Sequence, residues 1–386
     1  MAQHRAPTFP TRPVAQLLGS NGPIHAVAYS APPGTYILTG SSDRSIRLYN
    51  PSSTTPVPPP TTTNNTTNNS ITPRPAAPGT TPLPSARLIQ TYTSHAYAVL
   101  SLTVARDNAT FASSGGDRAV LLWDVTTAQT TRRFGAASTA LSHTGRVNAV
   151  SFGGAGDALI VSGGLDCTVR VWDVRAAGGQ KPVQVMGEAR DAVTCLAVGD
   201  GEIVAGSVDG RVRGYDVRMG RCVVDVFPGS VTSLGMARDG KTMLVGSLDS
   251  KVRLMDRRDG GCLRAFGERG WRNEELRVQS VFGGGERFVV VGDEMTGTGP
   301  EASSSASGSS SEDGRVWAWD ILTGKLVAAL SVPWGGGGEG RKRAIGSDGK
   351  EKERKNVVSC IAWKDGGFGD QFCVGGSSGT VTVFGE

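Results

Sequence analysis

Two sets of four polar and aromatic residues stand at spacings that could support hydrolytic chemistry. Each set contains a His, a Ser 18 or 19 residues later, an Asp four residues after the Ser, and a Trp six residues after the Asp. The two sets are His95, Ser113, Asp117 and Trp123, followed by His143, Ser162, Asp166 and Trp172. Ser, His and Asp are the side chains of a nucleophilic triad.

The order of roles in these sets favours a structural interpretation. We expect the Trp to donate to the Ser, the Ser to the His, and the His to the Asp. That arrangement uses up the serine proton and leaves no open oxyanion site, so a nucleophilic triad would be incomplete. The sequence therefore predicts two buried hydrogen-bond networks, and no catalytic residue is assigned.

The sets recur because the chain repeats. A segment ending in an aromatic or bulky residue and then Asp or Asn follows a turn Asp by seven residues, most clearly at 162–173 and 205–216. A period of roughly 40 to 45 residues with this ending is typical of the WD repeat, which forms one four-stranded propeller blade per copy. Seven copies align through their turn residues, which are Asp43, Asp117, Asp166, Asp209, Asp249, Asp313 and the pair Ser378 and Gly379. We predict an all-β, seven-bladed propeller forming a single domain over residues 1–386.

The strands of this ring follow from alternation and apolar content. The third strands alternate apolar and polar residues, as strands with one better-buried face do; they are 45–50, 119–124, 168–173, 211–216, 251–256, 315–320 and 380–385. The more apolar first strands, for example 147–152, 193–198 and 357–363, should lie innermost. Because the last copy ends on its third strand, we expect residues 14–18 to complete that blade and close the ring.

Three low-complexity segments interrupt the period and are predicted to be disordered loop insertions: 51–85, 295–311 and 335–356. The outermost strand of the first blade should follow at 87–92. The third insertion holds seven Lys or Arg and four Asp or Glu, a net +3 of the chain's +5. Its basic runs at 341–343 and 350–355 favour a solvated loop, with a nuclear import element as the alternative.

Other sequence features exclude several classes of protein. The N-terminal region has no continuous apolar run and no later stretch reaches a membrane-spanning length, so we expect a soluble protein of the cytoplasm and nucleus. The six Cys show no CxxC pair and should be reduced thiols, and neither a metal nor another cofactor is implied. Residues 375–379 match GxSxG, and Gly335, Gly337 and Gly340 match GxGxxG, but neither match is followed by the helix that its function requires.

Blades four to six are more specific than the generic repeat. The sequences VAGSVDGRVRGYDVRMG at 204–220, LVGSLDSKVRLMD at 244–256 and EDGRVWAWD at 312–320 resemble the mitogen-activated protein kinase organizer family of WD-repeat proteins. The resemblance runs through all seven blades and is strongest from about residue 143 to 330. It departs from the family at Leu276, where the family usually has Tyr, and in the three insertions. It implies a scaffold for mitogen-activated kinase signalling, a component of the spliceosome, or both.

We therefore expect a protein-binding scaffold that is monomeric on its own and reads neither a nucleic-acid sequence nor a membrane. Exposed aromatic and Arg side chains dominate interface energetics. On the loops that lead into the first strands and on the Asp-bearing turns, the partner-binding candidates are Tyr97, Arg118, Arg146, Trp271 and Arg272. Two alternatives remain: a substrate receptor of a cullin-type ubiquitin ligase, docking its adaptor through Arg175 and Arg218, and a propeller hydrolase.

Overall fold

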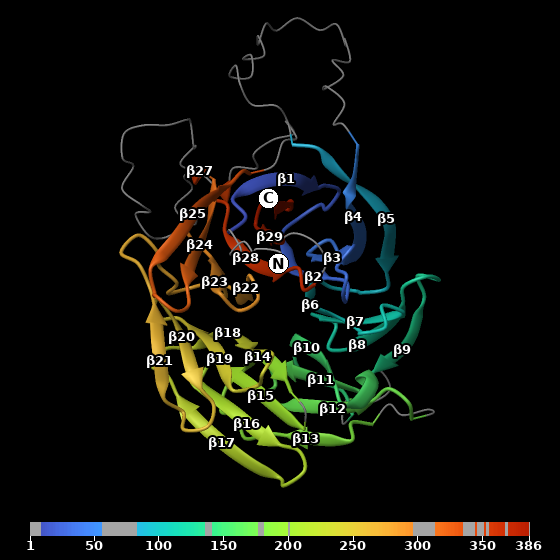
Figure 1. Ribbon diagram of the computed structural model, residues 1–386. Helices are drawn as coiled ribbons and strands as arrows, with labels where there is room; N and C mark the ends of the chain where they lie inside the picture. The colour runs from blue at the N-terminus through green and yellow to red at the C-terminus, as the bar shows by residue number, and fades with distance from the viewer. Residues whose placement is uncertain are drawn as a thin grey trace, which may run out of the picture.

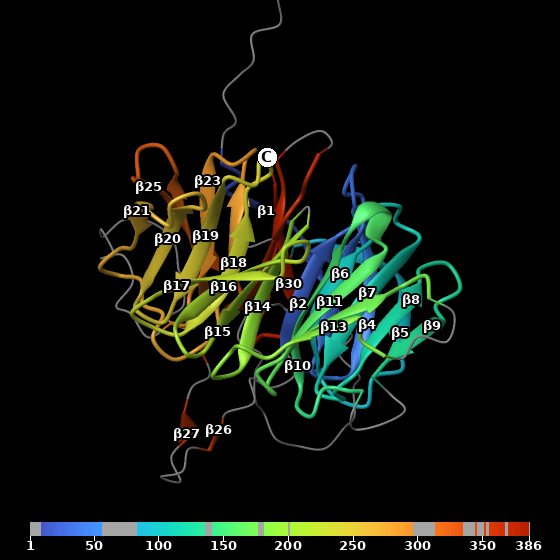
Figure 2. The same cartoon turned by 90° about the horizontal axis from the view of Figure 1, so that it is seen from below.

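The chain forms a ring of four-stranded antiparallel sheets around a central channel (Figure 1). The computed structural model describes residues 9–55, 83–135, 141–176, 181–199, 201–295, 313–334, 344–345, 351–352, 355–366 and 370–385. Figure 2 shows the sheets from the side, packed face to face around the ring. Apart from a short 3₁₀ turn at Ala155–Asp157, every regular element of the described residues is a strand. The predicted seven-bladed, all-β propeller is confirmed.

Each blade runs from an inner first strand to an outer fourth strand, and in blades 1 to 6 the strands follow sequence order. Blades 1 to 3 contain β2 (Ile24–Tyr29), β3 (Ile37–Ser41), β4 (Ser45–Thr55) and β5 (Ser85–Thr93); β6 (Val99–Val104), β7 (Thr110–Gly115), β8 (Val120–Asp124) and β9 (Thr130–Phe134); and β10 (Val147–Gly153), β11 (Leu159–Gly164), β12 (Val169–Asp173) and β13 (Gln184–Met186). Blades 4 to 6 contain β14 (Val193–Val198), β15 (Glu202–Ser207), β16 (Arg211–Asp216) and β17 (Arg221–Val226); β18 (Val231–Met236), β19 (Thr242–Ser247), β20 (Lys251–Asp256) and β21 (Cys262–Phe266); and β22 (Ser280–Gly283), β23 (Phe288–Gly292), β24 (Gly314–Asp320) and β25 (Leu326–Val332). Blade 7 contains β28 (Val358–Trp363), β29 (Phe372–Gly376), β30 (Val381–Gly385) and β1 (Arg12–Leu17).

The N-terminal strand closes the ring, as the sequence predicted. β1 pairs antiparallel with β30, with Arg12 opposite Gly385 and Leu17 opposite Val381. Its Ala15 and Leu17 side chains are buried in the core that blades 7 and 1 share. β1 also meets the outer strand of blade 1, where the Gln16 N–H donates to the Pro84 carbonyl at 2.9 Å. Blades 1 and 7 therefore join through their outer strands as one eight-stranded sheet.

The first predicted insertion differs from the structure at its start. β4 continues to Thr55, with Thr54 opposite Ala86, because the polar stretch 51–55 still finds pairing partners on β5. The predicted loop start at residue 51 was therefore wrong. Residues 56–82 and 296–312 lie outside the described residues, so the loop predictions there remain predictions.

The third insertion contains a short hairpin of β26 (Ala344–Ile345) and β27 (Glu351–Lys352). Figure 2 places this hairpin at the face opposite the one where the chain ends. The basic run 341–343, the glycines at 335, 337 and 340, and residues 350, 353 and 354 lie outside the described residues.

Polar side chains near the start of the inner strands form hydrogen bonds to the inner strand of the next blade. Most first strands shift register there, for example between Val147 and Ala149, which turns one side chain toward the next blade. Asn148 Nδ2 donates to the Val193 carbonyl at 2.8 Å, and Thr194 Oγ1 donates to the Val231 carbonyl at 2.6 Å. Neighbouring blades are thus tied at the channel, in addition to the apolar clusters between their sheets.

Candidate functional site

Two faces of the ring carry the loops. The top face holds the loops that lead from one blade into the first strand of the next and the turns between second and third strands. The bottom face holds the remaining turns and the places where β1 begins and β30 ends.

In blades 2 and 3 the predicted polar sets meet beneath the top face. His95 places Nδ1 2.8 Å from Asp117 Oδ2 and Nε2 2.7 Å from Ser113 Oγ, and Trp123 Nε1 donates to the same Oγ at 2.8 Å. Blade 3 repeats this geometry: His143 Nδ1 lies 2.8 Å from Asp166 Oδ1 and Nε2 2.8 Å from Ser162 Oγ, and Trp172 Nε1 donates to Ser162 at 2.8 Å. Both sets are buried.

The surroundings of the blade 3 network suit a structural role. Burial alone would raise the pKa of Asp166, but the hydrogen bond and charge of His143, with the Thr144 N–H and Thr168, lower it to about 2. Gly164 is required beside the network, because a Cβ there would stand 2.7 Å from His143 Nδ1 and 2.8 Å from Asp166 Oδ1. Ser162 is occupied by Trp172 and His143 at once, so this arrangement fixes the turn rather than presenting a nucleophile.

Blades 1, 4 and 5 hold the same turn with an arginine in place of the His and Trp. In blade 4, Arg213 Nη2 lies 2.7 Å from Asp209 Oδ2, and its Nη1 donates to Ser207 Oγ at 2.8 Å. Arg253 makes the matching contacts with Asp249 and Ser247. Burial would raise the pKa of Asp209, but the hydrogen bonds of Arg213 and Ser207 hold it far below its ordinary value. Our sequence reasoning missed this network.

Blade 6 uses acidic residues in another way. Trp317 Nε1 donates to Asp293 Oδ2 at 2.8 Å, and burial raises the pKa of Asp293. The next residue, Glu294, is buried and accepts three backbone N–H groups, from Glu274, Glu275 and Leu276, at 2.9 to 3.0 Å. A carboxylate that accepts three backbone donors fixes the loop leading into β22.

One of the five predicted partner-binding residues is placed where it cannot bind a partner. Trp271 is 1% exposed, donates from Nε1 to the Gly292 carbonyl at 2.9 Å and packs edge-on against Trp319. Its prediction as a top-face anchor was wrong, because a large aromatic ring between two arginines in the sequence fills the core between blades 5 and 6.

The other four candidates are exposed on the top face. Tyr97 is 62% exposed, Arg118 and Arg146 lie on the neighbouring turns, and Arg272 lies 4.0 Å from Glu274. Tyr97 and Arg118 stand two and one residues from His95 and Asp117, so the blade 2 network holds both of their loops. Apolar side chains add to this surface at Leu165, which is 48% exposed, and at Val208, which is 38% exposed.

Arg175 and Arg218 lie apart from these residues, on the bottom face. Each follows a third strand whose final Asp accepts its backbone N–H: Asp173 from Arg175 at 2.7 Å and Asp216 from Arg218 at 2.9 Å. Both side chains are exposed, and Arg175 Nη2 donates to the Ala155 carbonyl at 3.2 Å.

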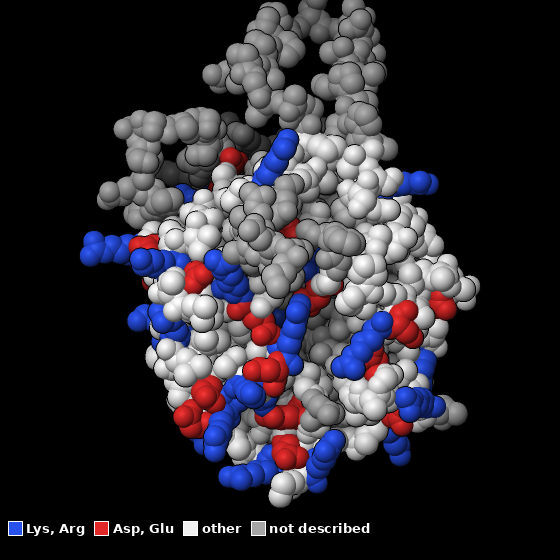
Figure 3. Space-filling model, viewed as in Figure 1, with Lys and Arg blue, Asp and Glu red and all other residues white. Residues whose placement is uncertain are grey.

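The bottom face has two hollows of different character. Figure 3 shows this face as mostly uncharged over β4 and β5, and interleaved with Lys, Arg, Asp and Glu elsewhere. A groove of about 510 Å³ lies between blades 1 and 2, lined by Pro33, Tyr36, Leu48 and Ile89 among others, with no charged lining residue.

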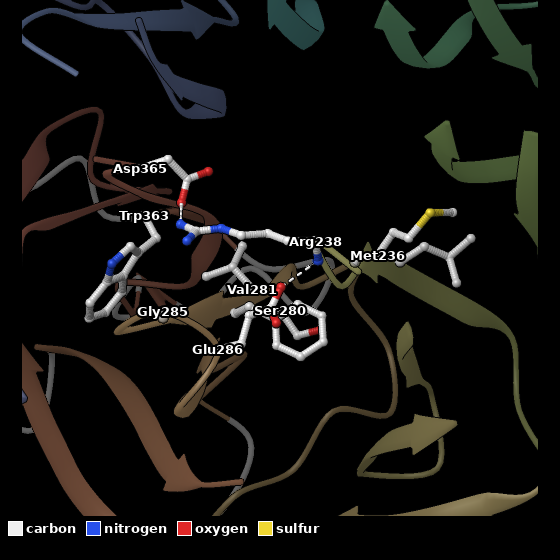
Figure 4. A pocket seen from close by; sticks show the side chains of 12 residues that line it. Met236, Arg238, Ser280, Val281, Gly285, Glu286, Trp363 and Asp365 are labelled. Carbon is white, nitrogen blue, oxygen red and sulfur yellow. Dashed lines mark hydrogen bonds and ion pairs between the residues drawn. The ribbon is translucent and has the colours of Figure 1, made fainter. Parts of the chain in front are cut away.

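The second hollow, of about 230 Å³, lies beside the channel between blades 5, 6 and 7. Figure 4 shows Arg238 reaching across it to Asp365, 2.8 Å away, with Trp363 along its wall. The Arg238 N–H also donates to Glu286. These contacts join three blades and leave no unpaired acid or base for catalysis among the residues drawn.

Other kinds of site find little support within the described ranges. The described residues bring together no group of three or more His, Cys, Asp or Glu that could hold a metal ion, and no described helix has the length and apolar character to cross a bilayer. All six cysteines are free. The GxSxG serine, Ser377, donates to the Lys355 carbonyl at 3.1 Å in the turn between β29 and β30, a strand-to-strand connection.

Comparison with known proteins agrees with the repeat architecture. The family model "WD domain, G-beta repeat" matches residues 11–50, 86–124, 137–173 and 221–256. Human WD repeat domain-containing protein 83 is 36% identical over 152 residues, which is 39% of this chain and 42% of that protein. The chain therefore spans less than half the length of this relative at that similarity.

Two further relatives align with the chain, one over a longer and one over a shorter part of its length. The WD repeat domain-containing protein 83 homolog of Dictyostelium discoideum is 25% identical over 345 residues, 82% of this chain and 87% of that protein. The guanine nucleotide-binding protein subunit beta of Zea mays is 43% identical over 65 residues, 17% of each chain. The chain contains WD repeats over the matched residues and is similar over part of its length to WD repeat domain-containing protein 83.

Proposed function

We propose that this protein is a non-catalytic scaffold that binds other proteins through its top face. The observation that carries the proposal is the exposed group of Tyr97, Arg118 and Arg146 on loops of blades 2 and 3. An aromatic ring and arginines are the side chains that dominate interface energies. WD-repeat proteins generally work in this way, which supports the proposal.

The rigidity of the two blades adds a physical reason. The His95 to Asp117 and His143 to Asp166 contacts are buried and hold the loops on either side of the exposed residues. A surface that is already ordered loses little conformational entropy when it binds. We therefore assign affinity to this part of the face before any other.

The finer proposal concerns the assembly. The resemblance to the mitogen-activated protein kinase organizer family supports a scaffold for mitogen-activated kinase signalling, a part in pre-mRNA splicing as a spliceosome component, or both. We place the protein in the cytoplasm and the nucleus accordingly, with kinase-pathway or spliceosomal proteins as its partners.

The test is affinity purification of the tagged, full-length protein from nuclease-treated nuclear and cytosolic fractions, with partners identified by mass spectrometry. Core splicing proteins in the nuclear fraction would support the spliceosomal role, and pathway kinases in the cytosolic fraction the signalling role. A triple variant with Tyr97→Ala, Arg118→Ala and Arg146→Ala should lose the specific partners.

A matched control is Arg258→Ala, which changes an exposed arginine on the bottom face. It should leave the partner set unchanged. If the triple variant retains every partner that the native protein captures, the top-face proposal is wrong. If only Arg175→Ala with Arg218→Ala abolishes capture, and the lost partner is a cullin adaptor, the ligase-receptor alternative replaces it. Turnover in an esterase and peptidase screen would instead contradict a non-catalytic protein.

A further inference from the structure

Three basic side chains from different blades converge on the top mouth of the central channel. His25 stands at the start of β2 in blade 1, Arg146 directly before β10 in blade 3, and Arg277 on the loop leading into β22 in blade 6. Arg277 Nη1 donates to the Asn148 carbonyl at 3.0 Å. Because blades 3 and 6 face each other across the ring, this bond spans the channel (Figure 1).

The charge of Arg277 is not balanced by any described carboxylate. No described Asp or Glu forms an ion pair with its guanidinium, and the Asn148 carbonyl is its hydrogen-bond acceptor among the described residues. Burial lowers the pKa of Arg277, and the neighbouring charge of Arg146 lowers it further. A largely buried cation without a counter-charge is unfavourable unless an anion from elsewhere compensates it.

The pKa of His25 is affected by the same excess of positive charge. Its Nε2 lies 2.7 Å from Ser42 Oγ, so the ring is held in place at the mouth. Burial lowers the pKa of His25, and the charges of Arg277 and Arg146 lower it further. In contrast to His95 and His143, which each contact an Asp, His25 has no carboxylate partner among the described residues.

Two exposed leucines, Leu165 and Leu276, form an apolar part of the rim of the mouth, beside the exposed acids Glu274 and Glu275. Leu165 donates its N–H to the Arg146 carbonyl at 2.8 Å and is thus fixed beside that arginine. Leu276, next to Arg277, is 44% exposed, and its backbone is held by Glu294. A ligand that enters the mouth therefore meets cationic groups at the centre and apolar side chains on part of the rim.

We propose that the channel mouth binds the phosphate group of a phosphorylated segment of a partner protein, with Arg146 and Arg277 as its counter-ions and the apolar part of the rim in contact with the flanking residues. Two permanent positive charges match a phosphate dianion better than a single carboxylate. The planar guanidinium groups also suit bidentate contacts to phosphate oxygens. When Ser42 Oγ donates to Nε2 of His25, the Nδ1–H of the neutral ring is left to donate to a phosphate.

This inference goes beyond the proposed scaffold, because anion binding is measurable on the isolated protein. The first experiment titrates the full-length protein with inorganic phosphate and follows the imidazole signals of its four histidines by NMR, with His25→Gln used to assign the His25 signal. We expect a saturable shift of the His25 signal. Arg146→Gln should weaken phosphate binding by about tenfold, the usual effect of removing one charge-assisted hydrogen bond.

The control is Arg258→Gln on the bottom face, which should bind phosphate as the native protein does. Arg146 is exposed, so its variant is expected to fold, and unchanged His95 and His143 signals would verify this. A His25 signal that does not move with phosphate, or a shift that Arg146→Gln leaves unchanged, overturns the proposal.

The second experiment identifies the source of the phosphate. A degenerate peptide pool centred on phosphoserine and its unphosphorylated counterpart are compared by fluorescence anisotropy. Binding of the phosphorylated pool alone, lost in Arg146→Gln and retained in Arg258→Gln, supports the proposal. Phosphate binding without phosphopeptide binding would reduce the site to one for a free anion and overturn the peptide proposal. Neither result depends on which proteins the scaffold assembles.

Discussion

Blades 2 and 3 and blades 4 and 5 stabilise the same turn in different ways. In the first pair, an Asp accepts a hydrogen bond from one ring nitrogen of a His. The other ring nitrogen lies within hydrogen-bond distance of a Ser, and a Trp donates to the same Ser. In the second pair, the Asp and Ser are both held by one arginine that reaches back from the third strand. The turn is alike, yet the His side chain comes from the loop before the blade and the Arg side chain comes from the hairpin itself.

The difference teaches that the turn Asp is the constant and its partner is exchangeable. A histidine can lose its proton when its carboxylate partner is removed, whereas an arginine remains charged. The His network ties the loop from the preceding blade to the turn through a side chain, whereas in blade 4 that loop reaches Asp209 through the backbone N–H of Arg190, at 3.2 Å. The exposed candidates Tyr97, Arg118 and Arg146 belong to the blades with the more extensive network.

The largest effect on stability is expected from opening the ring, because both pairs of blades depend on the closed ring. Deleting residues 1–20 takes away β1 and its buried Ala15 and Leu17 and opens the ring. We expect a loss of more than about 4 kcal/mol, beyond the usual range for a single change, with both pairs of blades destabilised together. Thermal unfolding followed by circular dichroism measures this. An unchanged melting temperature would show that ring closure by β1 is dispensable.

Removing the Asp in blade 4 should have the next largest effect. Asp209→Ala leaves Arg213 buried and charged without a partner, which we expect to destabilise the protein by about 3 kcal/mol. Adding Arg213→Met removes the stranded charge and should restore more than half of that loss. Urea unfolding of the single and double variants provides the measurement. A double variant no more stable than Asp209→Ala would contradict an electrostatic origin.

The matching change in blade 3 should be milder. Asp166→Ala removes the partner of His143 and the more distant ion pair of Arg170, 3.6 Å away, which keeps its hydrogen bond to the Leu141 carbonyl, so we expect a loss of about 1 to 3 kcal/mol for the groups left unpaired. The same urea series measures it. If Asp166→Ala lowers the free energy of unfolding more than Asp209→Ala does, the expected difference between the His network and the Arg network is wrong.

Acid should separate the two networks further. The folded pKa of Asp166, about 2, lies below its ordinary value of 3.8, so its contribution is complete above roughly pH 4 and is lost as the pH falls toward 2. The pKa of Asp209 is lowered further by Arg213, so its contribution persists to lower pH. Asp166→Asn should flatten the loss of stability between pH 4 and 2, whereas Asp209→Asn should flatten it over the same range and also below pH 2. Urea midpoints recorded across that range test this order.

The smallest effect on stability is expected at the surface. Tyr97→Ala removes an exposed ring, so the free energy of unfolding should change by less than about 0.5 kcal/mol while partner capture falls. Comparing the melting temperature with the yield of captured partners separates the two readouts. A clear loss of stability would show that Tyr97 is part of the network beneath it.

The strand framework was accessible from the sequence because period-2 alternation and the turn Asp mark each blade. The ring closure followed from one missing strand in the last repeat and one unassigned extended stretch. The arginine networks had a signal as well: Asp and Arg stand four apart in Asp43 and Arg47, in Asp209 and Arg213, and in Asp249 and Arg253.

The site was harder to predict from the sequence, because the exposure of a side chain depends on packing between blades. Trp271 follows Gly270 and precedes Arg272 in the sequence, yet its ring fills the core between blades 5 and 6 against Trp319. Nothing in the local pattern places Arg277 opposite Asn148, since 129 positions separate them and only the closed ring brings them together. Long-range contacts of this kind follow from the whole fold.

The pairing of β1 with β30 also sets an order of events during synthesis. The first strand emerges from the ribosome long before its partner exists, and at 5 to 20 residues per second the delay is on the order of tens of seconds. Throughout that time β1 lacks its antiparallel partner, and its pairing is limited to the contact of Gln16 with the outer strand of blade 1. A nascent chain in this state is a natural substrate for a chaperone that holds short extended apolar segments until the last blade arrives.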